Sequence, residues 1–271
     1  MTTPTELARA RATPARRSDR TWTLIRWSSP LVLLALWQLG SALGLIPQAV
    51  LPAPSLIAEA GVELIENGQL VDALAVSGVR VVEGLLLGGV LGVALGVAVG
   101  LSRWFEATVD PPMQMVRALP HLGLIPLFII WFGIGETPKI AIITLGVTFP
   151  LYLNVYAGIR GVDAQLIEAG ESLGLSRRGL VRHVILPGAL PGAMTGLRYS
   201  LGIAWLALVF AEQINADSGI GFLMVQARDF LRTDVIVVCL IVYAFLGLLA
   251  DFIVRSLERL LLQWRPTFTG R

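Results

Sequence analysis

The sequence predicts an all-α membrane protein with six transmembrane helices. Hydrophobic residues make up 55% of its 271 residues, the mean hydropathy is +0.73, and charged residues make up only 15%. Several apolar runs reach the roughly 20 residues that a helix needs to cross a bilayer, and no soluble domain of any size fits between them. The predicted spans are 28–46, 79–101, 113–132, 138–158, 190–214 and 235–254.

An arginine-rich stretch, residues 1–27, precedes the first span. Such a start also describes a secretory signal, but this basic region is long, no A-x-A cleavage site follows Ile46, and further spans come after it. We therefore expect a retained anchor. The predicted organisation is a basic cytoplasmic tail at 1–27, a membrane domain at 28–258 and a second cytoplasmic tail at 259–271.

The distribution of lysine and arginine predicts the orientation. With the N-terminus inside, only four of the 21 basic residues face outward, namely Arg80, Lys139, Arg228 and Arg232. This satisfies the positive-inside rule and leaves both termini cytoplasmic. The first outer loop, 47–77, contains four acidic residues and no basic one. Its stretch PAPSLIAEAGVELIENG predicts a short amphipathic helix with a serine N-cap.

Glycines and prolines mark special positions in the middle spans. Pro120, Pro126 and Pro150 predict kinks in the third and fourth spans. In the second span one glycine recurs at every fourth position, which puts all of them on one helix face and favours a tight packing seam within or between protomers. The simpler alternative is that glycine is common in membrane helices. The seam residues are Gly88, Gly92, Gly96 and Gly100.

The composition excludes several kinds of chemistry. Two histidines, one cysteine and no H-E-x-x-H or C-x-x-C motif give little basis for a metal centre, and we do not expect an enzyme. The sole lysine, Lys139, follows no phosphate-binding loop, so any ATPase must be another polypeptide. The basic residues lie in loops and tails rather than in one patch, which argues against nucleic acid.

A few ionisable residues lie within or near the spans. Arg80 and Glu83 are a turn apart, as are Asp251 and Arg255, and such spacing predicts self-neutralised pairs. Glu212 has no basic residue within a turn. A role in a transport pathway and a solvated carboxylate at the helix end both stay open for it.

The segment 163–187 is too polar to be inserted in the membrane and too regular to be a linker. Asp163 can cap a first amphipathic helix, Gly174 suits a left-handed C-terminal cap, Ser176 can cap a second helix and Pro187 ends it. We expect a rigid bent knob on the cytoplasmic face. It would bind either anionic lipid headgroups or a protein socket, and the bend and the acidic side chains favour the socket.

Seven residues of this segment are similar to the E-A-A-x3-G-x9-I-x-L-P signature of ABC importer permeases. They are Glu168, Ala169, Gly170, Gly174, Val184, Leu186 and Pro187. Two of them depart mildly from it, with Gly170 in place of alanine and Val184 in place of isoleucine. Further stretches between residues 51 and 266, among them LPAPSLI, VRALPHLGLIPLFIIWFGIGETPKI and SGIGFLM, resemble the branch that imports sulfonates, taurine, nitrate or related solutes.

The resemblance implies a type I ABC importer transmembrane fold in the bacterial inner membrane, with cytoplasmic coupling helices at 163–187. It implies as partners a cytoplasmic ATPase, which would bind ATP and Mg²⁺, an extracytoplasmic solute-binding protein and a second copy of this chain. No cofactor is expected in the chain itself. Aliphatic sulfonates are the first expectation for the solute, with taurine, nitrate or another small solute as alternatives. The alternative of another class is a stand-alone channel or secondary carrier.

Polar residues that face inward on the fourth and fifth spans are the candidates for the pathway, with helix packing as the alternative explanation. They are Asn154, Tyr199, Ser200, Trp205, Glu212 and Gln213.

Overall fold

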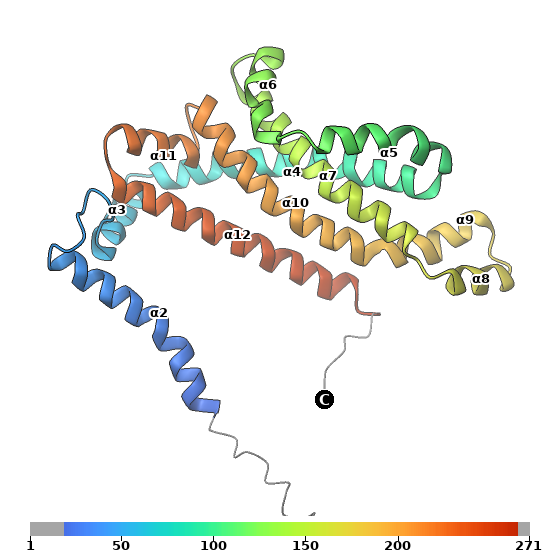
Figure 1. The fold of residues 1–271 in the computed structure, drawn as a ribbon, viewed down its shortest axis with the longest axis horizontal. Helices are drawn as coiled ribbons and strands as arrows, with labels where there is room; N and C mark the ends of the chain where they lie inside the picture. Colours follow the sequence, from blue (N-terminus) through green and yellow to red (C-terminus); the bar gives the residue numbers. More distant parts are fainter. Residues whose placement is uncertain (1–18, 265–271) are drawn as a thin grey trace, which may run out of the picture. The chain divides into compact units, whose positions relative to one another are not determined.

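The computed structural model describes residues 19–264, apart from the side chains of 19–27 and 215. Residues 1–18 of the predicted N-terminal tail and 265–271 of the predicted C-terminal tail lie outside this range. The regular elements of the described residues are helical (Figure 1). In chain order they are α2 (Asp19–Ala42), α3 (Pro54–Glu66), α4 (Gln69–Leu101), α5 (Arg103–Arg117), η1 (His121–Leu124), α6 (Ile125–Phe132), α7 (Glu136–Arg160), α8 (Ala164–Ser172), α9 (Arg177–Leu180), η2 (Val181–Ile185), α10 (Leu186–Asn215), α11 (Ile220–Asp229) and α12 (Thr233–Leu261).

The chain divides into two compact units, with the boundary after Glu59. In the first unit, Gln38 of α2 binds Ser55 of α3 twice: its side-chain amide donates to the serine hydroxyl and its oxygen accepts from the serine N–H, both at 3.1 Å. The predicted amphipathic helix is confirmed as α3, but Ser55 lies inside its first turn because the helix begins at Pro54. Its predicted role as N-cap is therefore wrong.

Four helical segments are long and apolar enough to cross a membrane, namely Gln69–Leu101, Glu136–Arg160, Arg177–Ile214 and Thr233–Leu261. They confirm the second, fourth, fifth and sixth predicted spans, although α4 begins at Gln69 rather than at 79. The first predicted span is a shorter apolar helix, Ser28–Ala42.

The third predicted span is broken. Arg103–Arg117 and His121–Phe132 meet at an angle of 87°, and counting this bent pair as one span gives five among the described residues. The break falls at Pro120, which lacks an N–H and disfavours a helical conformation in the residue before it. By contrast, α7 continues through Pro150, and Pro126 lies in the first turn of α6, so Pro120 is the one of the three prolines at which a helix is broken.

Helix α7 is the centre of the second unit. It packs against α4 on one side and α10 on the other, and α11 packs against α10 and α12 (Figure 1). The main apolar cluster contains Ile142, Ile143 and Val147 of α7 and Leu208 of α10, all almost fully buried. Ile125, from the bent segment, is part of the same cluster. This packing fixes the positions of α4 and α10 along α7.

Candidate functional site

The predicted glycine seam lies within the chain and joins α4 to α7. A Cβ atom added at Gly88 would lie 2.5 Å from the carbonyl oxygen of Thr144, and one at Gly92 would lie 2.7 Å from that of Thr148. Gly96 and Gly100 also pack against α7, closer to its C-terminal end. Because only glycine permits backbones to approach this closely, the four-residue repeat fixes the register of α4 on α7.

A second glycine repeat, which our reading of the sequence missed, joins α7 to α10. An added Cβ at Gly192 would lie 2.7 Å from the carbonyl oxygen of Asn154, and one at Gly196 would lie 3.0 Å from that of Pro150. With Gly188 these residues repeat at every fourth position, just as in α4. The same spacing rule applied to LPGALPGAMTG would have found this seam.

The segment 163–187 folds as a compact hairpin of α8 and α9. Asp163 accepts a hydrogen bond from the Gln165 N–H at 2.9 Å, Ser176 accepts one from the Gly179 N–H at 3.3 Å, and Gly174 has φ 80°. The three capping predictions are thus confirmed. Gly170 is buried, and a Cβ there would lie 2.7 Å from Leu180 Cδ2, so the two helices close directly on this glycine.

The predicted end of the second helix at Pro187 is wrong. A π-helical turn, Val181–Ile185, leads from α9 into α10, and Pro187 lies in the first turn of α10, where the missing N–H costs no helical hydrogen bond. The apolar helical segment therefore runs without interruption over Arg177–Ile214. A movement of α9 would therefore be transmitted along this continuous helical segment into the transmembrane part of α10.

The residues of the signature divide between the outside of the hairpin and its interior. Glu168 and Ala169 are exposed on α8, whereas Gly170 and the half-buried Val184 face each other inside the hairpin. Leu186 and Pro187 begin α10. Two large apolar side chains are exposed beside Glu168 and Ala169, namely Leu166 of α8 at 58% and Leu173, which directly follows α8, at 84%.

A charge cluster joins α4, α7 and α10 near the start of α7, with Arg80, Lys139 and Glu212 buried and Glu136 half exposed. Arg80 of α4 lies 2.6 Å from Glu212 of α10 and 2.5 Å from Glu136 of α7, and Lys139 is 2.9 Å from Glu136. The predicted pair of Arg80 with Glu83 is wrong, because the arginine reaches across to these other helices instead. The predicted pair of Asp251 with Arg255 is confirmed.

Glu212 is only 1% exposed, which excludes the solvated carboxylate considered from the sequence. Its oxygens accept hydrogen bonds from the Ser77 hydroxyl at 2.8 Å, from Arg80 and from the Gly221 N–H at 2.8 Å. The Arg80 guanidinium also donates to the carbonyl oxygen of Ser218 at 2.8 Å. A glutamate one turn before the end of a span, followed by S-G-I-G, is the only sequence signal we see for this cluster.

The candidate pathway residues occupy different surroundings. Asn154 and Tyr199 line one cavity between α7 and α10. Ser200 is fully buried and donates to the Val147 carbonyl oxygen at 2.8 Å, and Trp205 packs against the main apolar cluster. Gln213 contacts the sulfur of Met224 at 3.5 Å. The structure therefore brings together two of the six residues at a common cavity.

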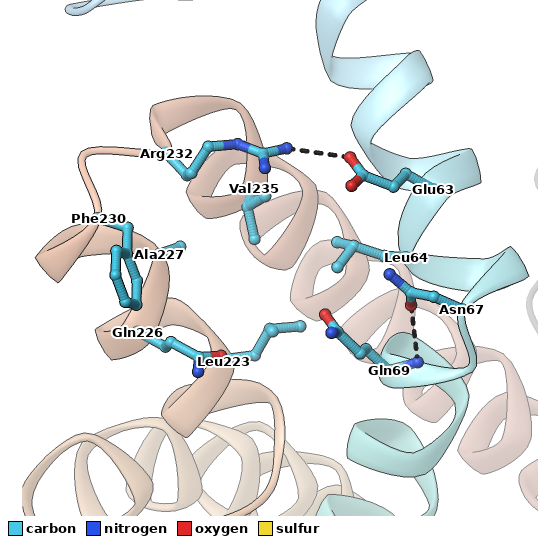
Figure 2. Close-up of a pocket in the computed structure, with 10 residues that line it drawn as sticks. All are labelled: Glu63, Leu64, Asn67, Gln69, Leu223, Gln226, Ala227, Phe230, Arg232 and Val235. Atoms are coloured by element: carbon cyan, nitrogen blue, oxygen red, sulfur yellow. Dashed lines mark hydrogen bonds and ion pairs between the residues drawn. The ribbon is translucent and has the colours of Figure 1, made fainter.

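A second cavity of about 410 Å³ lies between α3, α11 and the start of α12 (Figure 2). Arg232 points across it to Glu63 at 3.2 Å and also binds Asp234 at 2.9 Å. The hydrogen bonds to Asp234 and then to Glu63 raise the pKa of Arg232 above its usual value. Beside it, Leu231 has φ 57° and is 87% exposed, an uncommon conformation for a branched residue.

Comparison with known proteins covers most of the chain. Residues 88–263 match the family described as binding-protein-dependent transport system inner membrane component. The chain is 49% identical over 95% of its length to the putative aliphatic sulfonates transport permease protein SsuC of Escherichia coli strain K12, covering 97% of that protein. It is 39% identical to the taurine transport system permease protein TauC of the same strain, over 86% of each chain.

The fold is also similar to a solved structure of the MetNI methionine ABC transporter in an inward-facing conformation, with a TM-score of 0.57 and 22% identity over 69% of this chain and 95% of that one. This likeness supports the type I importer fold. The family match agrees with the signature in the α8–α9 hairpin and with the absence of a phosphate-binding loop from the sequence. The chain belongs to the family of binding-protein-dependent transport system inner membrane components and is a permease subunit of an ABC importer, not an enzyme.

Proposed function

We propose that this chain forms the membrane pathway through which a bacterial cell imports aliphatic sulfonates. The proposal rests on one observation: a relative that is 49% identical over nearly the whole of both chains is named for aliphatic sulfonates. The relative that is 39% identical is named for taurine, which is itself a small sulfonate. Taurine is therefore the first alternative solute, and nitrate or another small anion is a more distant one.

The α8–α9 hairpin is proposed as the docking surface for a separate cytoplasmic ATPase, which binds the ATP and Mg²⁺. Its exposed side combines Glu168 and Ala169 with two apolar side chains, Leu166 and Leu173. Acidic and apolar side chains together suit a groove on a protein, whereas anionic lipid headgroups would repel the carboxylates. Because α9 continues into α10, a push on the hairpin would reach the membrane.

The complete importer is proposed to contain two copies of this chain and an extracytoplasmic solute-binding protein. Identical subunits most often pair about a two-fold axis, and two copies of this chain would enclose a pathway between them. Both termini would lie in the cytoplasm, because that orientation gives the arginine-rich loops their usual side. The α3 and α11 surfaces would then face the solute-binding protein.

Growth of a deletion strain tests the proposal. We expect a strain without the gene to fail on an alkanesulfonate as sole sulfur source and to grow on sulfate, and the wild-type gene to restore growth. Glu168→Arg should not restore it, although the protein reaches the membrane. Failure on taurine or on nitrate alone would assign the chain to that solute instead. Normal growth of the deletion strain on all of these would refute an import role for these solutes.

A further inference from the structure

The cavity that contains Asn154 and Tyr199 has features of a ligand site. Its volume is about 590 Å³, within the range of roughly 300–1,000 Å³ typical of small-molecule sites. Its walls come from three places: the bend between α5 and α6, one face of α7, and one face of α10. The bend contributes Arg117 and His121, neither of which was a candidate from the sequence.

The lining is mostly apolar, and its few polar side chains gather toward one end. Helices α7 and α10 run in opposite directions, with Gly146 beside Ile203 and Asn154 beside Gly196. Tyr199 therefore lies at the level of Phe149, against whose ring His121 packs at 5.3 Å between centroids. At the other end the lining is apolar, formed by Ile142, Ile203, Leu206 and Ala207. A ligand with one charged end and one apolar end would fit this gradient.

The polar end contains donors that the chain does not use. Arg117 is an exposed side chain of the lining, and among the described residues no ion pair or side-chain hydrogen bond occupies its guanidinium, as is also true of Arg103 at the other end of α5. The Nε2 atom of His121 is buried and has no hydrogen-bond partner among the described residues. A buried polar atom without a partner costs free energy, which a bound acceptor would recover.

We propose that this cavity binds the solute, with Arg117 and His121 receiving the anionic head of an alkanesulfonate and the Ile142–Leu206 end receiving its alkyl chain. The sulfonate identity rests on the proposed function, whereas the site itself rests on the cavity. Tetrahedral oxyanions suit this pair because a guanidinium can donate two parallel hydrogen bonds to them and the imidazole Nε2–H a third. Tyr199 supplies a further polar contact at the level of Phe149, and Asn154 supplies another about one turn further along α7.

A lipid phosphate offers the same chemistry as a sulfonate, because Tyr199 and Leu206 are more than half exposed and the cavity opens on the surface of the chain. The full complex with its ATPase is therefore tested in nanodiscs of neutral lipid and in nanodiscs with added phosphatidylglycerol. Radiolabelled butanesulfonate and radiolabelled phosphatidylglycerol are the two probes. The variants are Arg117→Gln and His121→Gln, and the matched control is Arg103→Gln at the opposite end of α5, outside this cavity.

We expect the wild-type complex to bind butanesulfonate in neutral lipid. Arg117→Gln and His121→Gln should each weaken this binding at least about tenfold, a loss typical of a charge-assisted hydrogen bond. The control Arg103→Gln should leave the affinity unchanged. In the wild type, affinity should rise about fourfold per methylene from methane- to butanesulfonate. Leu206→Asn should flatten that rise. A folded Arg117→Gln protein that binds butanesulfonate normally would overturn the site, as would absence of binding by the wild-type complex.

Binding of phosphatidylglycerol alone, lost in Arg117→Gln, would identify a lipid site and also overturn the proposal. Uptake by cells separates this failure from that of the proposed function. If the Arg117→Gln strain takes up sulfonate as the wild type does, the importer assignment stands and only this site is wrong. If the wild-type gene supports no sulfonate uptake, the proposed function itself is wrong.

Discussion

Arg80 Nη1 lies 2.6 Å from Glu212 Oε1, and both side chains are almost completely buried. The two residues are far apart in the sequence, and their pair connects α4 to α10 and, through the Gly221 N–H, to the start of α11. Isolated charges in apolar surroundings are costly, so Glu212 depends on Arg80 as its cationic partner, whereas Arg80 is neutralised by both Glu212 and Glu136. The cluster therefore acts as a fixed joint between helices that the glycine seams also hold to α7.

Removing one member of this pair should destabilise the protein strongly. Arg80→Met leaves Glu212 as a buried carboxylate without its cationic partner, which costs about 3–5 kcal/mol. Glu212→Leu should cost less, because Arg80 keeps its ion pair with Glu136. The double variant should recover much of that loss, because it buries no unpaired charge at this contact. Thermal unfolding of purified protein in detergent measures the effect. Glu83→Gln, at an exposed position of the same helix, is the control and should unfold like the wild type.

The α4 seam predicts opposite results for two neighbouring glycines. Gly92→Ala would put a methyl group 2.7 Å from a backbone oxygen of α7 and should destabilise the protein by about 1–3 kcal/mol. At Gly89 the nearest atom to an added methyl group is Leu151 Cδ1 at 3.9 Å, so Gly89→Ala should be neutral or slightly stabilising. Equal unfolding temperatures for the two variants would contradict the close approach of α4 to α7.

A change inside the α8–α9 hairpin should abolish binding of the ATPase without unfolding the transmembrane helices. Gly170→Leu should force α8 away from Leu180 and abolish copurification of the ATPase, while the transmembrane helices stay folded. Gln165→Ala changes an exposed side chain of the same helix and should retain the ATPase. Copurification on an affinity tag, with size-exclusion chromatography of each variant, measures both properties. Normal ATPase binding by Gly170→Leu would show that the hairpin geometry is not required for docking.

Local features of the hairpin could be predicted from the sequence because each one depends on neighbouring residues. Asp163, Gly174 and Ser176 satisfy or terminate the backbone of their own turns, and their roles follow from side-chain chemistry alone. Pro187 was misjudged because proline is compatible with both the end of one helix and the first turn of the next. Only the packing of Ala189 against α7 and the continuous run of α10 decide between them.

The contacts between distant helices could not be predicted in the same way. Glu83 is the carboxylate one turn from Arg80, but the guanidinium binds Glu136 and Glu212, which approach only after α7 and α10 have packed. Likewise, His121 and Arg117 reach the cavity because the chain bends by 87° after α5. The proline that causes the bend was visible in the sequence, but its angle and direction were not.

ATP-dependent uptake in proteoliposomes tests the central claim most directly. The vesicles contain this chain and its ATPase, with the solute-binding protein outside and radiolabelled alkanesulfonate as the solute. We predict accumulation only when ATP is present on the ATPase side, and none with the Glu168→Arg chain. Equal sulfonate uptake without ATP or without the ATPase would contradict the claim, because it would mean that the chain conducts the solute alone.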